Sequence, residues 1–299
     1  MRLLHLTDPH LTSLEKQSLA GLSAKRSLSF LSWRRKRRFQ HAPPALEHVT
    51  EAARLEGADQ ILVTGDLTHI GLPEEIRAAR PWLESLGAPA DVMLVPGNHD
   101  LMARDSWGPV ATNWNDYLHL PSDLAGGGIQ DAFPVMREVG ELVIIGVASA
   151  HPTPILMASG SLGDGQMRRL DEMAREARRK NKFCCILIHH PPVPGIVNRR
   201  RALVDAAELE LLLERQGVDL VLHGHTHRNE EVAVGGRMIY STASASSVTA
   251  HAPAAYRVIQ VERDAEGWRV EMTLKSLAGS GPDDWRMEVV EQTRWRSGL

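Results

Sequence analysis

The sequence predicts an α/β sandwich with additional antiparallel strands near its C-terminal end, folded as a single domain over residues 1–299. Two observations carry this prediction. Up to about residue 228, short apolar runs alternate with segments of helical spacing, as they do in stacked β-α-β units. Beyond residue 228 the helical segments stop, and short stretches of alternating polarity are separated by Gly235-Gly236 and by residues 264–267. That second pattern is typical of antiparallel strands joined by short turns.

The apolar runs and the helical spacing give each expected element its place. Strands are expected at residues 3–6, 61–63, 92–95, 142–147, 184–188 and 220–222. Helices are expected at about 43–57, 73–87, 164–181 and 205–216, with prolines in two first turns and glycines at several ends. Antiparallel strands are expected near 231–240, 254–262 and 268–275. One connection departs from this plan: residues 11–42 separate the first strand from its helix, where a few residues would suffice.

The composition is that of an ordinary globular protein, with 43% apolar residues, 24% charged residues and a formal net charge of −3. No apolar run approaches the roughly 18–20 residues of a membrane span, and the first residues indicate a strand, not a signal peptide. The two cysteines, Cys184 and Cys185, are neighbours in an apolar run. Neighbours in a strand point to opposite faces, so no disulfide is expected between them. We therefore expect a reducing, cytoplasmic location.

Polar side chains of the kinds that bind metals follow nearly every expected strand of the first part. They are Asp8 and His10, Asp66, Asn98 with His99 and Asp100, His189 with His190, and His223, His225 and His227. In open α/β sheets, ligands bind in the crevice beyond the carboxyl ends of the strands. Five such ends could therefore bring these side chains together.

Carboxylates mixed with imidazoles suit borderline ions such as Mn, Fe or Zn, and the absence of a thiolate argues against a structural zinc site. A carboxylate can bridge two ions roughly 3.5–4 Å apart, and such a pair can hold both the attacking and the leaving oxygen at phosphorus. Water beside such ions also loses its proton near neutral pH. A single Asp or His at a strand end is usually a cap or a solvated loop residue. Their joint occurrence in this order predicts a metal centre for hydrolysis.

Taken together, these motifs resemble those of the calcineurin-like metallophosphoesterases, over residues 8–227. The resemblance implies a four-layer α/β/β/α sandwich of two mixed sheets with flanking helices, and a metal-dependent hydrolase of phosphoric esters. It implies that Asp8, His10 and His227 hold one ion. It also implies that Asn98, His189 and His225 hold a second ion, and that Asp66 bridges the two. Manganese is the first expectation for both ions, with iron, zinc and cobalt as alternatives.

By the same resemblance, His99 lies outside the metal ligands and contacts the substrate phosphate. There it would protonate the leaving oxygen or stabilise the transition state, a role that suits histidine because its pKa lies near working pH. His69 stands three residues after Asp66, where many relatives carry an Asp or Asn that helps to position the catalytic histidine. This departure leaves the group that orients His99 open, and Asp100 is expected to fix the loop.

The connection at residues 11–42, called the insertion below, begins directly after His10 and therefore starts at the rim of the expected site. Residues 25–38 hold seven basic residues and no acidic one, beside several apolar residues that include Trp33. Three interpretations stay open. The segment is a solvated helix that packs its apolar face on the body, a lid for an anionic or amphiphilic substrate, or a nucleic-acid contact. Candidate substrate-binding residues are Arg34, Arg35, Arg37 and Arg38, and Arg199 and Arg200 of a second basic run.

These observations predict an enzyme that hydrolyses a phosphodiester or pyrophosphate bond. Lipid pyrophosphate hydrolases of the resembled superfamily carry a basic and apolar insertion over the site, so a lipid-linked nucleotide such as UDP-diacylglucosamine is one candidate substrate. A cyclic-nucleotide or glycerophospho-diesterase is the alternative, and a nuclease is the alternative of another class. A lipidic substrate would agree with peripheral contact at an anionic membrane surface, on its inner face. The net charge makes no strong case for nucleic acid as a partner.

Overall fold

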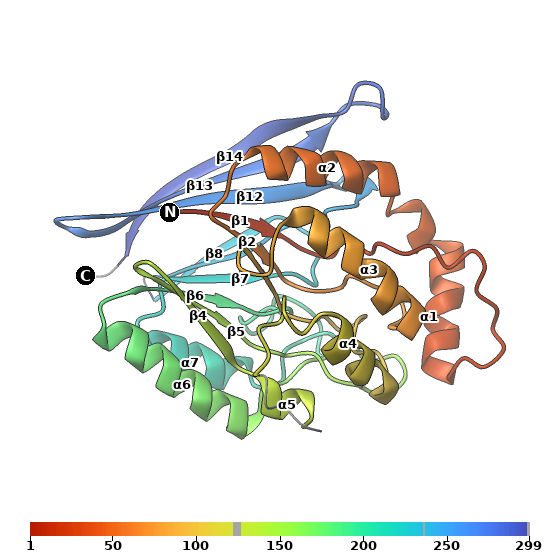
Figure 1. Cartoon of the computed structure of the whole chain (residues 1–299), viewed down its shortest axis with the longest axis horizontal. Helices are drawn as coiled ribbons and strands as arrows, with labels where there is room; N and C mark the ends of the chain where they lie inside the picture. The colour runs from red at the N-terminus through yellow and green to blue at the C-terminus, as the bar shows by residue number, and fades with distance from the viewer. Residues whose placement is uncertain (122–126, 236, 298–299) are drawn as a thin grey trace.

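The structure is a computed structural model, and it describes residues 1–121, 127–235 and 237–297. It contains two six-stranded mixed sheets with helices on their outer faces, which confirms the predicted α/β fold class (Figure 1). The first sheet has the order β14 (Arg286–Ser297), β13 (Gly267–Ala278), β12 (Ala255–Asp264), β1 (Arg2–Leu6), β2 (Gln60–Val63) and β3 (Val92–Leu94). The second has the order β4 (Val135–Val139), β5 (Leu142–Gly146), β6 (Phe183–Leu187), β7 (Leu220–His223), β9 (Arg237–Ser241) and β8 (Glu230–Val234).

Four helices fall close to the expected ranges: α2 (Pro43–Leu55), α3 (Pro73–Leu86), α6 (Gly163–Arg179) and α7 (Ala206–Gln216). The structure adds α1 (Ala24–Arg35) and the 3-10 turn η1 (Arg37–Phe39) in the insertion, and α4 (Trp107–Asn113), α5 (Ile129–Ala132) and the 3-10 turn η2 (Arg104–Ser106) after β3. A short hairpin joins β10 (Val248–Thr249) to β11 (Ala252–Pro253). Figure 1 shows α6 and α7 side by side against the second sheet, and α2 against the first.

Several elements were not expected from the sequence, and β14 is the longest of them. It pairs with β13 along its whole length, but most of its side chains are exposed. An edge strand of this kind carries little apolar periodicity, because backbone hydrogen bonds and not a buried face hold it in place. β4 at the opposite sheet is also an edge strand with partly exposed side chains, and it was missed for the same reason.

The core has two main layers. The larger one lies between the sheets and under α2 and α3, and the second lies between the outer face of the second sheet and α6 and α7. Cys184 packs in the outer layer and Cys185 in the layer between the sheets. Both thiols are free, which confirms that these neighbours form no disulfide. Within the described ranges, no helix is long and apolar enough to cross a membrane.

The insertion docks on the body of the protein through one side of α1. Phe30 and Trp33 are buried in a small apolar cluster that also contains Ile70 and Met102, from the loops after β2 and β3. The apolar face of α1 therefore packs on the body, as the first interpretation of this segment requires. Figure 1 places α1 at the end of the molecule away from both termini.

A buried guanidinium strengthens this contact. Arg26 of α1 is 6% exposed, and its side chain donates to the carbonyl oxygens of Ile70 at 3.0 Å and Gly71 at 2.7 Å. It also donates to the Ser106 hydroxyl at 3.0 Å and pairs with Asp105 at 2.6 Å. Hydrogen bonds from a charged donor to buried acceptors are stronger than those between neutral groups. One of the seven basic residues within residues 25–38 is thus structural.

Candidate metal centre

Five of the expected ligands lie in a backbone conformation that is uncommon for residues other than glycine. The φ angle is 50° at Asp8, 44° at His10, 54° at Asp66, 68° at His225 and 55° at His227. Side chains make this left-handed region costly, and residues held in it cluster at functional sites. Because the bends follow β1, β2 and β7 directly, they aim side chains from both sheets into one crevice.

Backbone contacts hold the bends against each other. The Asp8 N–H donates to the Gly65 carbonyl at 3.0 Å, and the His10 N–H donates to the Asp66 carbonyl at 3.1 Å. The loop after β3 then passes beside the Asp66 carboxylate at Gly97, where an added Cβ would overlap that carboxylate. Glycine is therefore required at residue 97 for a steric reason, since only a residue without a side chain permits this close approach.

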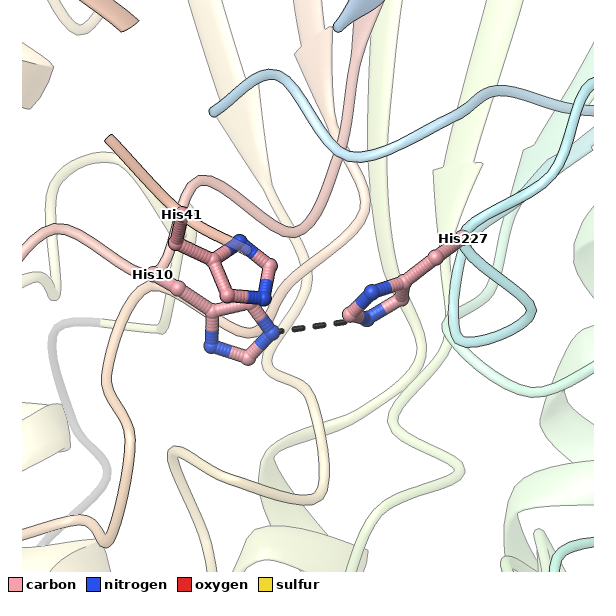
Figure 2. A group of neighbouring side chains, drawn as sticks. All are labelled: His10, His41 and His227. Carbon is pink, nitrogen blue, oxygen red and sulfur yellow. Dashed lines mark hydrogen bonds between the residues drawn. The ribbon is translucent and has the colours of Figure 1, made fainter. Parts of the chain in front are cut away.

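One group of candidate ligands combines Asp8, His10, Asp66 and His227, whose ligand atoms lie within 4.8 Å of one another. The Nε2 atoms of His10 and His227 are 3.4 Å apart and approach from opposite sides of the crevice (Figure 2). His227 Nε2 also lies 3.2 Å from Asp8 Oδ1. The structure thus brings together the four side chains that the resemblance assigns to the first ion.

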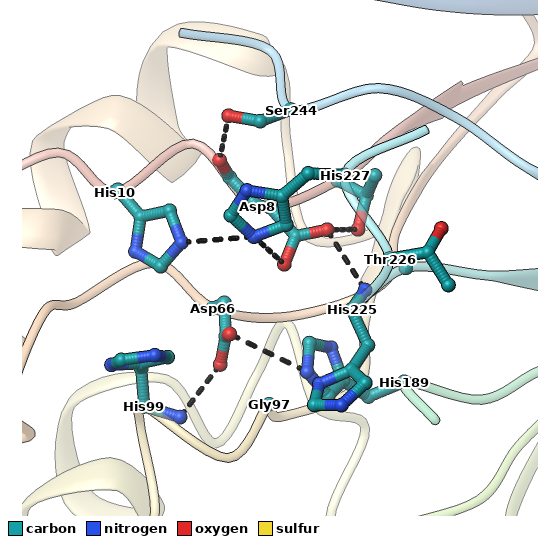
Figure 3. A network of polar contacts seen from close by, with 12 residues as sticks. Asp8, His10, Asp66, Gly97, His99, His189, His225, Thr226, His227 and Ser244 are labelled. Carbon is teal, nitrogen blue, oxygen red and sulfur yellow. Dashed lines mark hydrogen bonds and ion pairs between the residues drawn. The ribbon is translucent and has the colours of Figure 1, made fainter. Parts of the chain in front are cut away.

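A second group combines Asp66, His189 and His225, again within 4.8 Å (Figure 3). Asn98 belongs with it, because its Oδ1 lies 2.7 Å from His225 Nδ1 and 3.1 Å from His189 Nε2. Asp66 Oδ2 is 3.4 Å from His189 Nε2. Asp66 is therefore common to both groups, which is the arrangement expected of a bridging carboxylate.

The loop that carries Asp66 also orients one histidine of each group. The carbonyl of Thr68 lies 2.9 Å from Nδ1 of His10, and the carbonyl of Thr64 lies 2.7 Å from Nδ1 of His189. A carbonyl only accepts, so each Nδ1 carries the proton, which leaves Nε2 as the ligand atom when the ring is neutral. Metal-binding histidines usually donate their other N–H to a carboxylate or a backbone carbonyl in this way.

The donor atoms of the two ligand groups are better suited to binding cations than to forming hydrogen bonds with one another. His225 Nε2 is buried and has no hydrogen-bond partner in the described part of the chain, and Asp8 Oδ1 has none either, although the His227 ring lies 3.2 Å from it. Asn98 Oδ1 lies in the same space, close to ring nitrogens of His189 and His225. Buried polar atoms without partners are costly, and a positive ion would supply the missing partner. A set of carboxylate, imidazole and amide donors suits borderline divalent ions.

The ionisation of Asp66 and His189 in the second ligand group also favours a bound cation. Burial alone would lower the pKa of His189, but the Asp66 carboxylate reverses this and raises the pKa to about 9. Burial likewise opposes ionisation of Asp66, yet His189 and His99 hold its pKa well below the ordinary value. The pair therefore holds one proton between carboxylate and imidazole, where a cation would otherwise lie. Metal binding at such a site releases that proton.

His99 lies beside the ligand groups, and two of its contacts define its role. Its Nδ1 donates to the backbone carbonyl of His69, and its Nε2 accepts from the Arg37 guanidinium at 2.7 Å. Burial, and then the charge of Arg37, lower the pKa of His99 to about 4. The group that orients His99 is thus a main-chain carbonyl, so this orientation does not require an Asp or Asn side chain at residue 69.

Asp100 fixes the loop that carries Asn98 and His99. Its Oδ1 accepts from the Thr68 N–H at 3.0 Å, and its Oδ2 accepts from the Gly97 N–H at 2.9 Å. Burial, and then the nearby Asp66 carboxylate, raise the pKa of Asp100 to about 7. The carboxyl group joins the loops after β2 and β3, which agrees with the loop-fixing role expected for it.

Two histidines next to the expected ligands serve the framework. His190 is buried, with Ser149 Oγ 2.8 Å from its Nδ1 and the Ala158 carbonyl 3.1 Å from its Nε2. Both of its ring nitrogens are therefore occupied by protein atoms. His223 is buried as well and contacts the Gly224 carbonyl at 3.1 Å. Neither residue belongs to the ligand groups found in the described part of the chain.

The metal groups open into a cavity of about 650 Å³ that the insertion helps to line. Of the six arginines proposed for substrate binding, Arg37 lines this cavity. The other five are exposed and are absent from its described lining: Arg34, Arg35, Arg38, Arg199 and Arg200. Four basic residues that were not proposed do line it, namely Lys25, Lys36, Arg201 and Arg228. Sequence position alone did not indicate which members of each basic run face the site.

Lys25 shows how the insertion is held over the cavity. Its ammonium donates to the Thr153 carbonyl at 2.9 Å and to the Thr153 hydroxyl at 2.7 Å. These bonds join α1, which packs on the loops of the first sheet, to the segment that follows the second sheet strand β5. The cavity is therefore covered by a bridge between the two halves of the sandwich, and Leu28 and Leu156 contribute apolar walls.

His41 is a site residue that the sequence analysis missed. It lines the cavity, and its ring centroid lies 4.5 Å from that of His10 and 5.6 Å from that of His227. Burial, and then the neighbouring His227, lower its pKa to about 2. No local motif marks it, since it lies 31 positions after His10 at the end of the insertion. The one sequence feature that could have indicated it is its position just before α2, the helix that follows the insertion.

The chain was then compared with known proteins. A family model described as calcineurin-like phosphoesterase matches residues 1–229. A probable cyclic nucleotide phosphodiesterase of Synechococcus sp. is 29% identical over 225 residues, which cover 72% of this chain and 76% of that protein. A glycerophosphodiester phosphodiesterase of Enterobacter lignolyticus is 28% identical over 141 residues, covering 46% and 44%. The crystal structure of a dimetal phosphatase from Danio rerio has a similar fold, with a TM-score of 0.65 at 15% identity and 99% coverage of both chains.

Proposed function

This chain belongs to the calcineurin-like phosphoesterase family, and from that premise we propose that it hydrolyses phosphodiester bonds with a pair of metal ions bridged by Asp66. The observation that carries the proposal is the sharing of Asp66 between two ligand groups, each of which combines side chains from both sheets. The remaining proposed ligands are Asp8, His10 and His227 for one ion, and Asn98, His189 and His225 for the other. Relatives named as cyclic nucleotide and glycerophosphodiester phosphodiesterases support a diester as substrate.

The chemistry divides between the ions and the side chains around them. Bound in this site, a pair of ions supplies Lewis acidity toward the phosphoryl oxygens and makes the attacking water more acidic. Since Nδ1 of His99 is held by the His69 carbonyl, a proton for the leaving oxygen must pass through Nε2. Arg37 adds a fixed positive charge at that same atom, where negative charge on the phosphoryl group needs compensation.

We propose manganese as the first metal to test, with iron, zinc and cobalt as alternatives. The donor set supports this choice, because it mixes two carboxylates and an amide oxygen with four imidazoles. Thiolates, which would favour softer ions, are absent from the ligand groups found among the described residues.

The function is tested by a substrate panel on protein that has been stripped with a chelator and reloaded with Mn²⁺. The panel contains bis(4-nitrophenyl) phosphate, a cyclic nucleotide, a glycerophosphodiester, UDP-diacylglucosamine and single-stranded DNA. We expect hydrolysis of at least one small diester only after metal is restored, with the DNA left intact. Failure to cleave any member with any of the four metals would overturn the proposal, and preferred cleavage of DNA would assign a nuclease instead.

A lipid-linked nucleotide is the second candidate, and one observation favours it. Leu28 of α1 and Leu156 of the opposite loop are both exposed apolar side chains on the cavity wall. They lie beside a cationic lining, so the cavity suits a substrate with a phosphate part and an apolar part. Exposed Phe39, which lies against Arg38, likewise supports contact of the insertion with an anionic membrane surface. Faster turnover of UDP-diacylglucosamine than of the soluble diesters would support this candidate.

Arg37 is predicted to bind the substrate phosphate, because it is the arginine of the insertion whose guanidinium contacts His99. Replacing it with alanine should lower kcat/KM about 10- to 100-fold, since a hydrogen bond to a charged group is worth about 1.5–3 kcal/mol. Steady-state kinetics on the best diester of the panel would measure the effect. The matched control is Arg38→Ala, the exposed neighbour. Equal losses in the two variants would contradict a specific role for Arg37.

A further inference from the structure

The last residues of the insertion are tied to the metal site by backbone pairing. His41 forms an isolated bridge with Ser247, and the Ala42 N–H donates to the Ser246 carbonyl at 2.9 Å. The Val248 N–H donates to the Gln40 carbonyl at 2.9 Å. The segment is thus held on both sides of His41, and the direction of that side chain follows from the fold.

The imidazole of His41 joins those of His10 and His227. Ligand atoms of the three rings lie within 4.8 Å of one another. Figure 2 shows the ring of His41 over that of His10, with one nitrogen of each directed toward His227. His10 and His227 are the histidines proposed for the first ion, so His41 meets their site from the side of the insertion.

The hydroxyls behind His41 determine which of its nitrogens is free. Ser244 Oγ donates its proton to the Asp8 carbonyl at 2.6 Å, so it can only accept from other neighbours. Ser246 Oγ lies 3.2 Å from Ser244 Oγ and 2.8 Å from His41 Nδ1. Ser244 Oγ also lies 3.3 Å from His41 Nδ1, and because it can only accept there, the ring proton lies on Nδ1. Nε2 then carries a lone pair, and no hydrogen-bond partner for it is found in the described ranges.

We propose that His41 is an additional ligand of the ion held by Asp8, His10 and His227. This inference rests on the proposed two-metal function and adds to it a ligand from the insertion. The physical reason is that unprotonated nitrogens gathered in one place repel each other, whereas a borderline cation binds imidazoles in preference to water. The serine behind Nδ1 orients the ring in the way that partners of metal-bound histidines usually do.

The proposed ligand couples metal binding to the position of the insertion. The His41 N–H donates to the Arg37 carbonyl at 3.2 Å, so His41 and the arginine that contacts His99 belong to one turn. An ion that binds His41 would therefore hold Arg37 against the catalytic histidine. Loss of the ion would leave that end of the insertion held by its backbone pairing alone.

Metal affinity and hydrogen exchange test the inference on the full-length protein. His41→Ala and His41→Gln are compared with wild type and with His48→Ala, a histidine on α2 that is outside the ligand groups. We expect both His41 variants to bind the first Mn²⁺ at least about tenfold more weakly, because loss of residues that merely orient ligands already costs about 10–100-fold. Backbone amides of residues 37–42 should gain metal-dependent protection in wild type and in His48→Ala, but not in the His41 variants.

The visible absorption of the Co²⁺-loaded protein supplies a further readout, since it reports the ligands of the ion directly. An unchanged affinity and an unchanged Co²⁺ spectrum in both His41 variants would overturn the inference. A fall in turnover beside them would identify His41 as a substrate contact instead. The proposed function fails in a different way, namely if wild type itself binds no pair of ions. Melting curves recorded in chelator establish that the variants are folded before metal is added.

Discussion

Replacing Asp66 with asparagine is expected to remove both metal ions and to lower diester turnover by more than about 10³-fold. The Lewis acidity of bound ions is worth several kcal/mol at the transition state, and each 1.36 kcal/mol is a factor of ten in rate. Asp66 belongs to both ligand groups, so the loss of its charge affects both ions together. Elemental analysis of the reloaded protein gives metal content, and hydrolysis of bis(4-nitrophenyl) phosphate gives turnover.

Asparagine is the informative replacement because it keeps the shape of the side chain. Its Oδ1 can still accept from the His99 N–H, which donates to Asp66 Oδ1 at 2.7 Å, so the loop should stay in place. Asp219→Asn is the matched control, since Asp219 is a buried carboxylate that accepts from Cys184 N–H, outside the ligand groups. Two equivalents of metal and near-normal turnover in Asp66→Asn would contradict a bridging role.

Replacing His99 with alanine should lower kcat about 10²–10⁴-fold, the usual size of a general-acid contribution, while both metals stay bound. The expected separation of metal content from turnover follows from the hydrogen bonds of the His99 ring, which join it to the His69 carbonyl and Arg37 and not to a proposed ligand. Turnover is measured on diesters whose leaving groups differ in basicity. Metal content is measured on the same preparations, so that a loss of ions cannot be mistaken for a loss of chemistry.

The dependence on the leaving group separates the two roles proposed for His99. A general acid matters most for a basic leaving group, so the loss in His99→Ala should grow from a nitrophenol to an alkyl alcohol. An equal loss for both would indicate that the ring stabilises charge on the phosphoryl group without transferring a proton. In the structure, burial and then the charge of Arg37 lower the pKa of His99 to about 4, so a bound phosphate must raise it before the ring can act as an acid.

Much of the fold could be predicted because its signals are local. The strands that carry the proposed ligands are short apolar runs, and each is followed within a few residues by Asp, Asn or His. The end of a buried strand is visible in the sequence, and parallel strands share an edge by topology. The edge strand β14 was missed because its mostly exposed side chains leave no apolar period to detect.

The nature of the donor atoms was likewise a property of the sequence. Carboxylate, amide and imidazole groups after successive strands predict metal ions of the hard or borderline class, whatever the exact position of each group in the fold. The left-handed φ angles at Asp8, Asp66 and His225, in contrast, could not be predicted from the sequence. None of these residues is a glycine, so the strain is held by surrounding contacts and not by local preference.

The sequence by itself thus determined the fold class, the kind of metal chemistry and the residues proposed to carry it. The tertiary structure decided which parts of the insertion reach the site: Arg37 from the basic run, and His41 from a segment without a motif. The reason is geometric. Which side of a helix faces a cavity depends on how that helix docks, and α1 docks through buried Arg26 and Trp33. Contacts of this kind join residues far apart in the chain, so no local pattern encodes them.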